Sequence, residues 1–166
     1  MMLKTLIISL GSVFFKLVAS ALLATSPAAA EGVSGVASVI DADTIEIRGQ
    51  RIRLHGIDAP ESRQLCGSDD GNWRCGQRAS AVLSDKIGRA PISCRVSGSD
   101  RYGRLIAVCF LGREDLNAWL VRNGWAMAYR RYSTDYIDEK EAARRNRLGI
   151  WRGRFVPPWD WRRSNR

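Results

Sequence analysis

Short stretches of alternating apolar and polar residues predict a chain built mainly from β-strands. The alternation is clearest in residues 44–47 and 51–54, and the turn-forming pair Gly49-Gln50 between them predicts a β-hairpin. A first strand is expected from residue 35 into this hairpin, and further strands at residues 92–96 and 105–111. A short extended piece is expected at residues 125–129.

Three segments have helical spacing instead. Residues 77–87 place Ala81, either Leu83 or Val82, and Ile87 on one side, and Gly88 and Pro91 end the helix. A second helix is expected at residues 114–123, and a third, charged one runs from the Ser133-Thr134-Asp135 caps to about residue 148. The order of strands and helices favours an α+β fold, mainly β: a five-stranded OB-type barrel with three helices.

The hairpin register predicts which side chains meet. With Gly49-Gln50 as the loop, Glu46 lies opposite Arg53, and an extended ladder places Asp41 opposite Asp58. Diagonal neighbours lie about 7–8 Å apart, so Asp43 and Asp58 are close enough to share one ion. However, Arg53 and Asp58 differ by an odd number of positions, which aims them at opposite faces of a regular strand. A site containing both therefore requires a bend, and Gly56 is the position predicted for it.

The acids at this strand end suggest a site for a hard cation and a phosphate. Asp58 and Glu61 follow the strand, Asp43 lies upstream, and Arg53 adds a planar cation. Each of these residues also has a simpler interpretation. The aspartates can be ordinary turn residues, and Arg53 can form a plain cross-strand pair with Glu46. Arg104, a further arginine in the turn at residues 100–104, can simply be exposed to solvent. His55, the single histidine, is more simply a strand residue than a general base, and Asp41 is either a hairpin-end residue or a partner of the site.

The first 30 residues are typical of a secretory signal. Two lysines accompany a mostly apolar run, and Ala28-Ala29-Ala30 is a small-residue cleavage site. The alternative is an uncleaved anchor, against which Lys16 argues because it interrupts the apolar run. We expect a periplasmic or secreted protein, without stable membrane association after cleavage. Residues 31–152 then form one domain, a monomer, and residues 153–166 a basic, extended tail containing Trp and Pro.

The charge of the chain favours polyanionic partners. Without the two lysines of residues 1–30, 24 basic side chains face 17 acidic ones, a net charge of +7. Charge alone does not distinguish nucleic acid from other acidic polymers.

Four cysteines in an exported chain predict two disulfides. Three pairings are possible. Cys66–Cys75 with Cys94–Cys109 is favoured, because the first closes a short polar loop and the second joins two neighbouring strands. The C-x₂-C spacing of a zinc site is absent, which argues against metal binding by these thiols.

Three separated motifs resemble the staphylococcal nuclease (thermonuclease) family. They are Val39-Ile40-Asp41-Ala42-Asp43-Thr44, Arg53-Leu54 followed by Ile57-Asp58-Ala59-Pro60-Glu61, and Asp100-Arg101-Tyr102-Gly103-Arg104. Leu120–Gly124 and Gly149-Ile150-Trp151 add to the similarity, which covers residues 35–151.

The resemblance implies an OB-type barrel and a calcium-dependent, sugar-nonspecific endonuclease that acts on DNA and RNA and leaves 3′-phosphates. It assigns calcium binding to Asp43, Asp58 and the backbone carbonyl of Ala59, which stands where the family often has threonine. It assigns catalysis to Arg53, Glu61 and Arg104. It assigns substrate binding to Arg101, Tyr102 and Tyr132. The disulfide loop departs from the founding member, and Arg130 replaces a second pocket tyrosine, which affects base or phosphate contacts.

Two other functions remain open from the sequence. One is a nucleic-acid-binding OB module without catalysis, against which the presence of all five key side chains argues. The other is a basic envelope protein that binds different acidic polymers.

Overall fold

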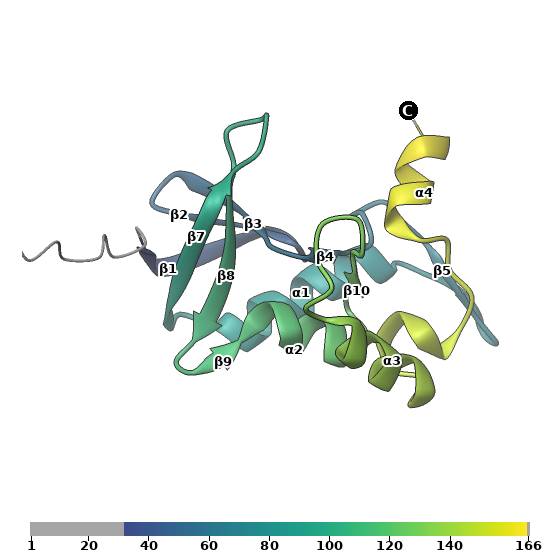
Figure 1. The fold of residues 1–166 in the computed structure, drawn as a ribbon. Helices are drawn as coiled ribbons and strands as arrows, with labels where there is room; N and C mark the ends of the chain where they lie inside the picture. The colour runs from purple at the N-terminus through teal and green to yellow at the C-terminus, as the bar shows by residue number, and fades with distance from the viewer. Residues whose placement is uncertain (1–31, 166) are drawn as a thin grey trace, which may run out of the picture.

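The protein, described here over residues 32–165 by a computed structural model, is built around a closed β-barrel (Figure 1). Four antiparallel pairings give the order β3-β2-β1-β7-β8, and a parallel pairing of β3 with β8 closes it. The barrel strands are β1 (Gly32–Asp41), β2 (Thr44–Ile47), β3 (Gln50–Leu54), β7 (Pro91–Ser99) and β8 (Leu105–Leu111). The predicted five-stranded, mainly-β barrel is confirmed.

The remaining elements surround this barrel. Helix α1 (Cys75–Ile87) falls between the third and fourth barrel strands, as predicted, while α2 (Leu116–Arg122) and α3 (Ile137–Arg145) follow the last. Residues 32–165 contain a fourth α-helix, so the expected number of three is too low. The other elements are β4 (Ile57–Asp58), β5 (Cys66–Ser68), β6 (Gly71–Trp73), β9 (Glu114–Asp115), β10 (Met127–Ala128), the 3-10 helix η1 (Gly149–Arg152) and α4 (Pro158–Ser164).

Two apolar clusters hold these elements together. The barrel core is formed by fully buried aliphatic side chains such as Ile45, Ile52 and Leu54, with Leu83 of α1 and Leu120 of α2 packed against them. A smaller cluster joins the Cys66–Cys75 region to η1 and the C-terminal segment; its partly buried members are Trp73, Trp151, Phe155 and Trp159.

The hairpin turn lies one residue earlier than predicted. The loop is Arg48-Gly49, whose φ angles of 51° and 79° are both positive, as the favoured two-residue hairpin turn requires. Moving the loop by one residue shifts the strand pairing by two residues. Because side chains alternate with a period of two, the apolar residues still face the core. The partners change: Glu46 lies opposite Arg51, and Thr44 lies opposite Arg53. The predicted Glu46–Arg53 pair is therefore wrong, which leaves Arg53 available to the site.

The predicted bend at Gly56 is present. Strand β3 ends at Leu54, Gly56 has φ 72°, and β4 then pairs with β10 rather than extending the hairpin. The predicted ladder pairs beyond Thr44 consequently do not form. Asp43 lies in the turn between β1 and β2, and Asp58 lies opposite Met127.

Both favoured disulfides are formed, Cys66–Cys75 and Cys94–Cys109. The expectation of an extended tail is wrong for residues 158–164, which form α4. Pro158 at the start of this helix has no N–H that would need a partner, and Asp160 and Arg162 suit its two ends. The predicted signal lies outside the described residues. In the described part of the chain no helix is both long and apolar enough to cross a membrane.

Candidate active site

Arg53 joins the two aspartates predicted to bind the cation. Its Nη1 lies 2.9 Å from Asp43 Oδ1, and its Nη2 donates to Asp58 Oδ1 at 2.8 Å. The two carboxylates reach this guanidinium from different elements, the β1–β2 turn and the end of β4. The structure thus brings Asp43, Asp58 and Arg53 together, and the bend at Gly56 makes this possible.

Three hydrogen bonds, two of them to the backbone, fix the position of Asp43. Its Oδ2 accepts the N–H of Ala59 at 3.1 Å, and its Oδ1 accepts the hydroxyl of Thr44 at 2.9 Å. Its own carbonyl accepts the N–H of Leu54 at 2.8 Å, which links the turn to the end of β3. The turn and the strand exit are therefore held as one unit.

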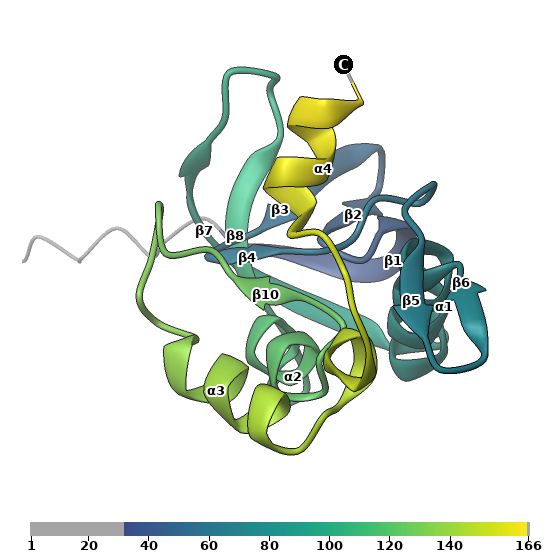
Figure 2. The same cartoon turned by 90° about the vertical axis from the view of Figure 1, so that its right-hand side faces the viewer.

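Glu61 meets a second guanidinium, that of Arg162 in α4. Arg162 Nη1 donates to Glu61 Oε1 at 2.6 Å, and Nη2 donates to Asp58 Oδ1 and Oδ2 at 3.0 and 2.8 Å. These bonds join α4, which lies above β4 in Figure 2, to the end of β4 and the turn after it, although α4 is about one hundred positions further along the chain. The cluster thus contains three carboxylates and two guanidinium groups.

Burial gives these charges their strength. Asp58 is fully buried, and burial raises the pKa of Asp58 above its ordinary value, which the hydrogen bond from Arg162 opposes without cancelling. Burial tends to lower the pKa of Arg53, but Asp43 and Asp58 outweigh it and raise that pKa. The contacts of Arg53 with Asp43 and Asp58 therefore lie in surroundings with little water, where charge pairs are strong, whereas the Arg162–Glu61 pair is partly exposed.

The donor set fits a hard divalent cation. Asp43 and Asp58 offer carboxylate oxygens, and Ala59, the residue after Asp58, has a backbone carbonyl; these are the ligand types that Ca²⁺ prefers. Within residues 32–165 no group of three or more His, Cys, Asp or Glu side chains is arranged to hold a metal. A cation held here would therefore depend on two carboxylates, backbone oxygen and water.

Arg104, the second predicted arginine, is not in this cluster. Its Nε and Nη2 bind Asp100 Oδ2 at 2.8 and 2.7 Å, and Asp100 Oδ1 accepts the backbone N–H groups of Tyr102 and Arg104. These contacts order the β7–β8 turn and, outweighing the effect of burial, lower the pKa of Asp100. The structure thus places Arg104 on Asp100, not on Asp43 or Asp58.

The predicted substrate-binding side chains lie on exposed loops. Tyr102 is 71% exposed, with the guanidinium groups of Arg101 and Arg104 within 5.0 and 5.8 Å of its ring centre. Tyr132 is 69% exposed and packs edge-on against Tyr129. Exposed aromatic rings beside arginines are suited to stacking on bases and binding phosphates.

The other sequence candidates have ordinary roles. His55 Nε2 lies 3.5 Å from Asp135 Oδ2, and its carbonyl accepts a hydrogen bond from the buried amide of Asn117. Asp41 accepts the hydroxyl proton of Ser62, the residue after Glu61. His55 therefore contacts none of the clustered carboxylates, whereas Asp41 supports the turn that carries one of them.

Two residues of the site region escaped the sequence analysis: Arg162 and Gln64. Arg162 was part of a segment expected to be extended, although Pro158, Asp160 and the following arginines are the usual signals of a helix start and end. No sequence pattern indicates that this helix folds back onto Asp58.

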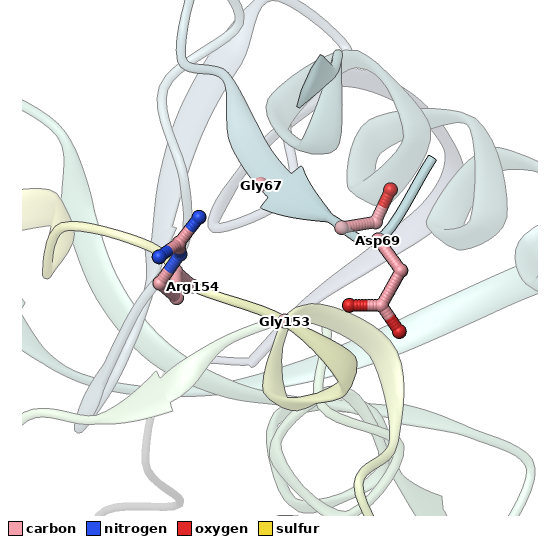
Figure 3. Close-up of a pocket in the computed structure, with 5 residues that line it drawn as sticks. Gly67, Asp69, Gly153 and Arg154 are labelled. Carbon is pink, nitrogen blue, oxygen red and sulfur yellow. The ribbon is translucent and has the colours of Figure 1, made fainter. Parts of the chain in front are cut away.

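A shallow cavity lies away from these residues. This cavity, between the β5–β6 hairpin and the C-terminal segment, is lined by Gly67, Ser68, Asp69, Gly153 and Arg154. Figure 3 shows Asp69 and Arg154 on either side of it. None of the clustered carboxylates lines this cavity, so the carboxylate site is identified from its charges and contacts, not from a pocket.

Comparison with known proteins agrees with this geometry. The family described as "Staphylococcal nuclease homologue" matches residues 51–153. The chain is 36% identical to a micrococcal nuclease of Shigella flexneri over 164 residues, covering 87% of this chain and 88% of the relative. It is 41% identical to the succinoglycan biosynthesis protein ExoI of Rhizobium meliloti over 143 residues, covering 81% and 73%.

An uncharacterized endonuclease of Haemophilus influenzae is 30% identical over 139 residues, covering 79% of this chain and 73% of the relative. The barrel, the three motifs and these matches agree with one another along most of the described chain. This protein therefore belongs to the staphylococcal nuclease family.

Proposed function

We propose that the protein is an exported, calcium-dependent endonuclease that hydrolyses phosphodiester bonds of DNA and RNA without regard to the sugar. The observation that carries the proposal is the sharing of one guanidinium, that of Arg53, by two buried aspartates from different elements, the β1–β2 turn and strand β4. Relatives named as nucleases support the reaction class, and two disulfides in a basic chain agree with export.

Each residue has a distinct task in this proposal. Asp43, Asp58 and the Ala59 carbonyl would hold Ca²⁺, which when bound withdraws charge from the phosphoryl oxygens. Arg53 makes three hydrogen bonds or ion contacts within the protein, to Asp43, Asp58 and the Ile57 carbonyl, out of five N–H donors. Its remaining donors are available to phosphate oxygens as negative charge builds up at phosphorus.

Glu61 is the proposed proton acceptor. It follows Asp58 by three residues, and its backbone N–H is bound by the Gln64 side chain at 3.3 Å. A carboxylate fixed next to the phosphate site can take the proton of an attacking water. The exposed Tyr102, Arg101 and Tyr132 would contact the bases and neighbouring phosphates. Arg104 would contribute to the reaction only if it leaves Asp100, and products would carry a 3′-phosphate.

Plasmid DNA and RNA cleavage assays with Ca²⁺ and then with a chelator test this function. We expect cutting of both substrates with Ca²⁺ and none with the chelator. Glu61→Gln should reduce cleavage by about 100-fold or more and keep substrate binding. Binding without cutting by the unaltered chain would indicate the non-catalytic OB module instead. Equal cleavage by Glu61→Gln would exclude Glu61 as the proton acceptor.

A further inference from the structure

The C-terminal segment, residues 153–164, runs from the disulfide-closed hairpin to the carboxylate cluster. Its start pairs with β5: Gly67 N–H donates to the Arg154 carbonyl at 2.7 Å, and Arg154 N–H donates back at 3.2 Å (Figure 3). The fully buried Gln64 then donates its Nε2 to the Val156 carbonyl at 2.6 Å. Since Gln64 also binds the N–H of Glu61, this side chain connects the segment directly to the catalytic turn.

Two aromatic contacts also hold the segment, one at Phe155 and one at Trp159. Trp159 stacks on Tyr129 with ring centres 5.2 Å apart and planes 8° from parallel, and Phe155 packs edge-on against Trp151. These contacts fix α4 at the point where Arg162 reaches Asp58 and Glu61. The position of Arg162 is therefore supported by contacts along the preceding part of the segment, from Arg154 to Trp159, and does not depend on its charge alone.

Arg162 uses most of the capacity of the Asp58 carboxylate. Oδ1 of Asp58 accepts from Nη2 of Arg53 and from Nη2 of Arg162, which fills its two lone pairs, and the same Arg162 nitrogen also donates to Oδ2. A cation that takes its usual position on Asp58 must compete with these bonds. The guanidinium and the divalent cation would both neutralise the same buried charge.

We propose that residues 153–164 form a latch in which Arg162 occupies the cation side of the site, and that a divalent cation binds by displacing Arg162 from Asp58. This inference rests on the cation site of the proposed function. Only molecules in which Arg162 has left Asp58 can then bind the cation. The apparent cation affinity is therefore reduced in proportion to the fraction of such molecules. Substrate turnover is then limited to molecules whose latch has opened.

Calorimetric titration of the cation-free protein with Ca²⁺ tests the latch. Arg162→Ala should bind Ca²⁺ with an apparent Kd lower than that of the unaltered chain by about tenfold or more. Arg163→Ala is the matched control: it removes the same charge from the next position of α4, where Arg163 pairs with Asp160 at the surface. It should change the Kd by less than about twofold.

Arg162→Lys provides a second variant that keeps the charge but cannot form the same fork of bonds. It should have an intermediate Kd, and thermal melts of each cation-free variant verify that it is folded. Equal affinities for the unaltered chain and both Arg162 variants would overturn the latch while leaving the cation site in place. If none of the folded chains bound Ca²⁺, the latch and the calcium part of the proposed function would both be wrong.

Discussion

At the residue scale, the site depends on the shape of one side chain as much as on its charge. Arg53 reaches Asp43 with one nitrogen and Asp58 with another, at 2.9 and 2.8 Å. A lysine carries the same charge but has a single nitrogen on a flexible stem, so it cannot keep both contacts and also bind phosphate.

We therefore expect Arg53→Lys to reduce kcat/KM for DNA cleavage by about 100-fold. Arg51→Lys on the same strand is the control, because Arg51 is mostly exposed and makes only a 3.8 Å contact with Glu46. It should stay within about twofold of the unaltered chain. Similar losses in the two variants would mean that the fork of Arg53 has no special part in the reaction.

Gly56 sets the geometry between Arg53 and Asp58. Its φ of 72° is unfavourable for other residues, and an added Cβ would lie 3.1 Å from the Tyr136 ring and 3.2 Å from Ser133 Cβ. Gly56→Ala should lower the free energy of unfolding by about 1–3 kcal/mol. Chemical denaturation measures this change.

Gly98→Ala is the comparison for that experiment, because no atom lies within 4 Å of the Cβ position there. It should change stability by about 0.5 kcal/mol or less. A Gly56→Ala protein as stable as this control would show that the bend does not require glycine.

Several residues of the site could be predicted from the sequence. Asp43, Asp58 and Arg53 were selected by their places at a strand end. Arg53 and Asp58 are an odd number of positions apart, and this spacing alone required the bend at Gly56. Arg162 was not accessible, because a contact across a hundred residues leaves no periodic pattern in the chain. The partner of Arg104 was also missed, since Asp100 is a local turn residue whose side-chain direction depends on the turn it forms.

At the element scale, α3 is attached to the rest of the fold through Tyr136. The hydroxyl of this residue, 5% exposed overall, donates to Asp115 Oδ2 at 3.2 Å, and Asp115 also caps α2 by accepting the N–H of Ala118. Burial first, and then the Asp115 charge, raise the pKa of Tyr136 above its ordinary 10.0.

This shift predicts a loss of stability in alkali. Above about pH 10 the unfolded chain releases the tyrosine proton while the folded chain keeps it, so the folded state binds more protons and stability falls as pH rises. Tyr136→Phe should be less stable by about 1 kcal/mol at pH 7, where a hydrogen bond is lost. Its unfolding free energy should decline less steeply between pH 9 and 11, as measured by urea denaturation.

The same alkaline slope in both proteins would contradict the assignment to Tyr136. Because the other tyrosines and lysines ionise in both chains, the difference between the two slopes is the informative quantity.

Some helices and strands could be predicted from the sequence pattern, and others could not. The barrel strands, α1 and the two disulfides follow from alternation, helical spacing and loop closure, whereas strands β5 and β6 lie in a segment predicted to be a loop. The hairpin loop was placed one residue too late, because Arg48 adopts the positive φ that is usual for glycine, and alternation is unchanged by a shift of a whole pleat. Helix α4 is short, and its packing on Tyr129 rather than its own sequence pattern determines its place.

At the scale of the whole molecule, the barrel gathers charges that are distant in sequence at one edge. The β1–β2 turn, the exit of β3, the turn after β4 and α4 all contribute to the carboxylate cluster. The net positive charge of the chain favours the approach of a polyanion, while the local cluster has one more carboxylate than guanidinium and so favours a cation.

A crystal structure with Ca²⁺ and a nucleotide that cannot be cleaved is the most direct test of the proposed cation and phosphate site. We predict one ion bonded at about 2.3–2.6 Å to oxygens of Asp43, Asp58 and the Ala59 carbonyl. A nucleotide phosphate should lie between that ion and Arg53. An ion bound elsewhere, or a phosphate that contacts neither the ion nor Arg53, would contradict it.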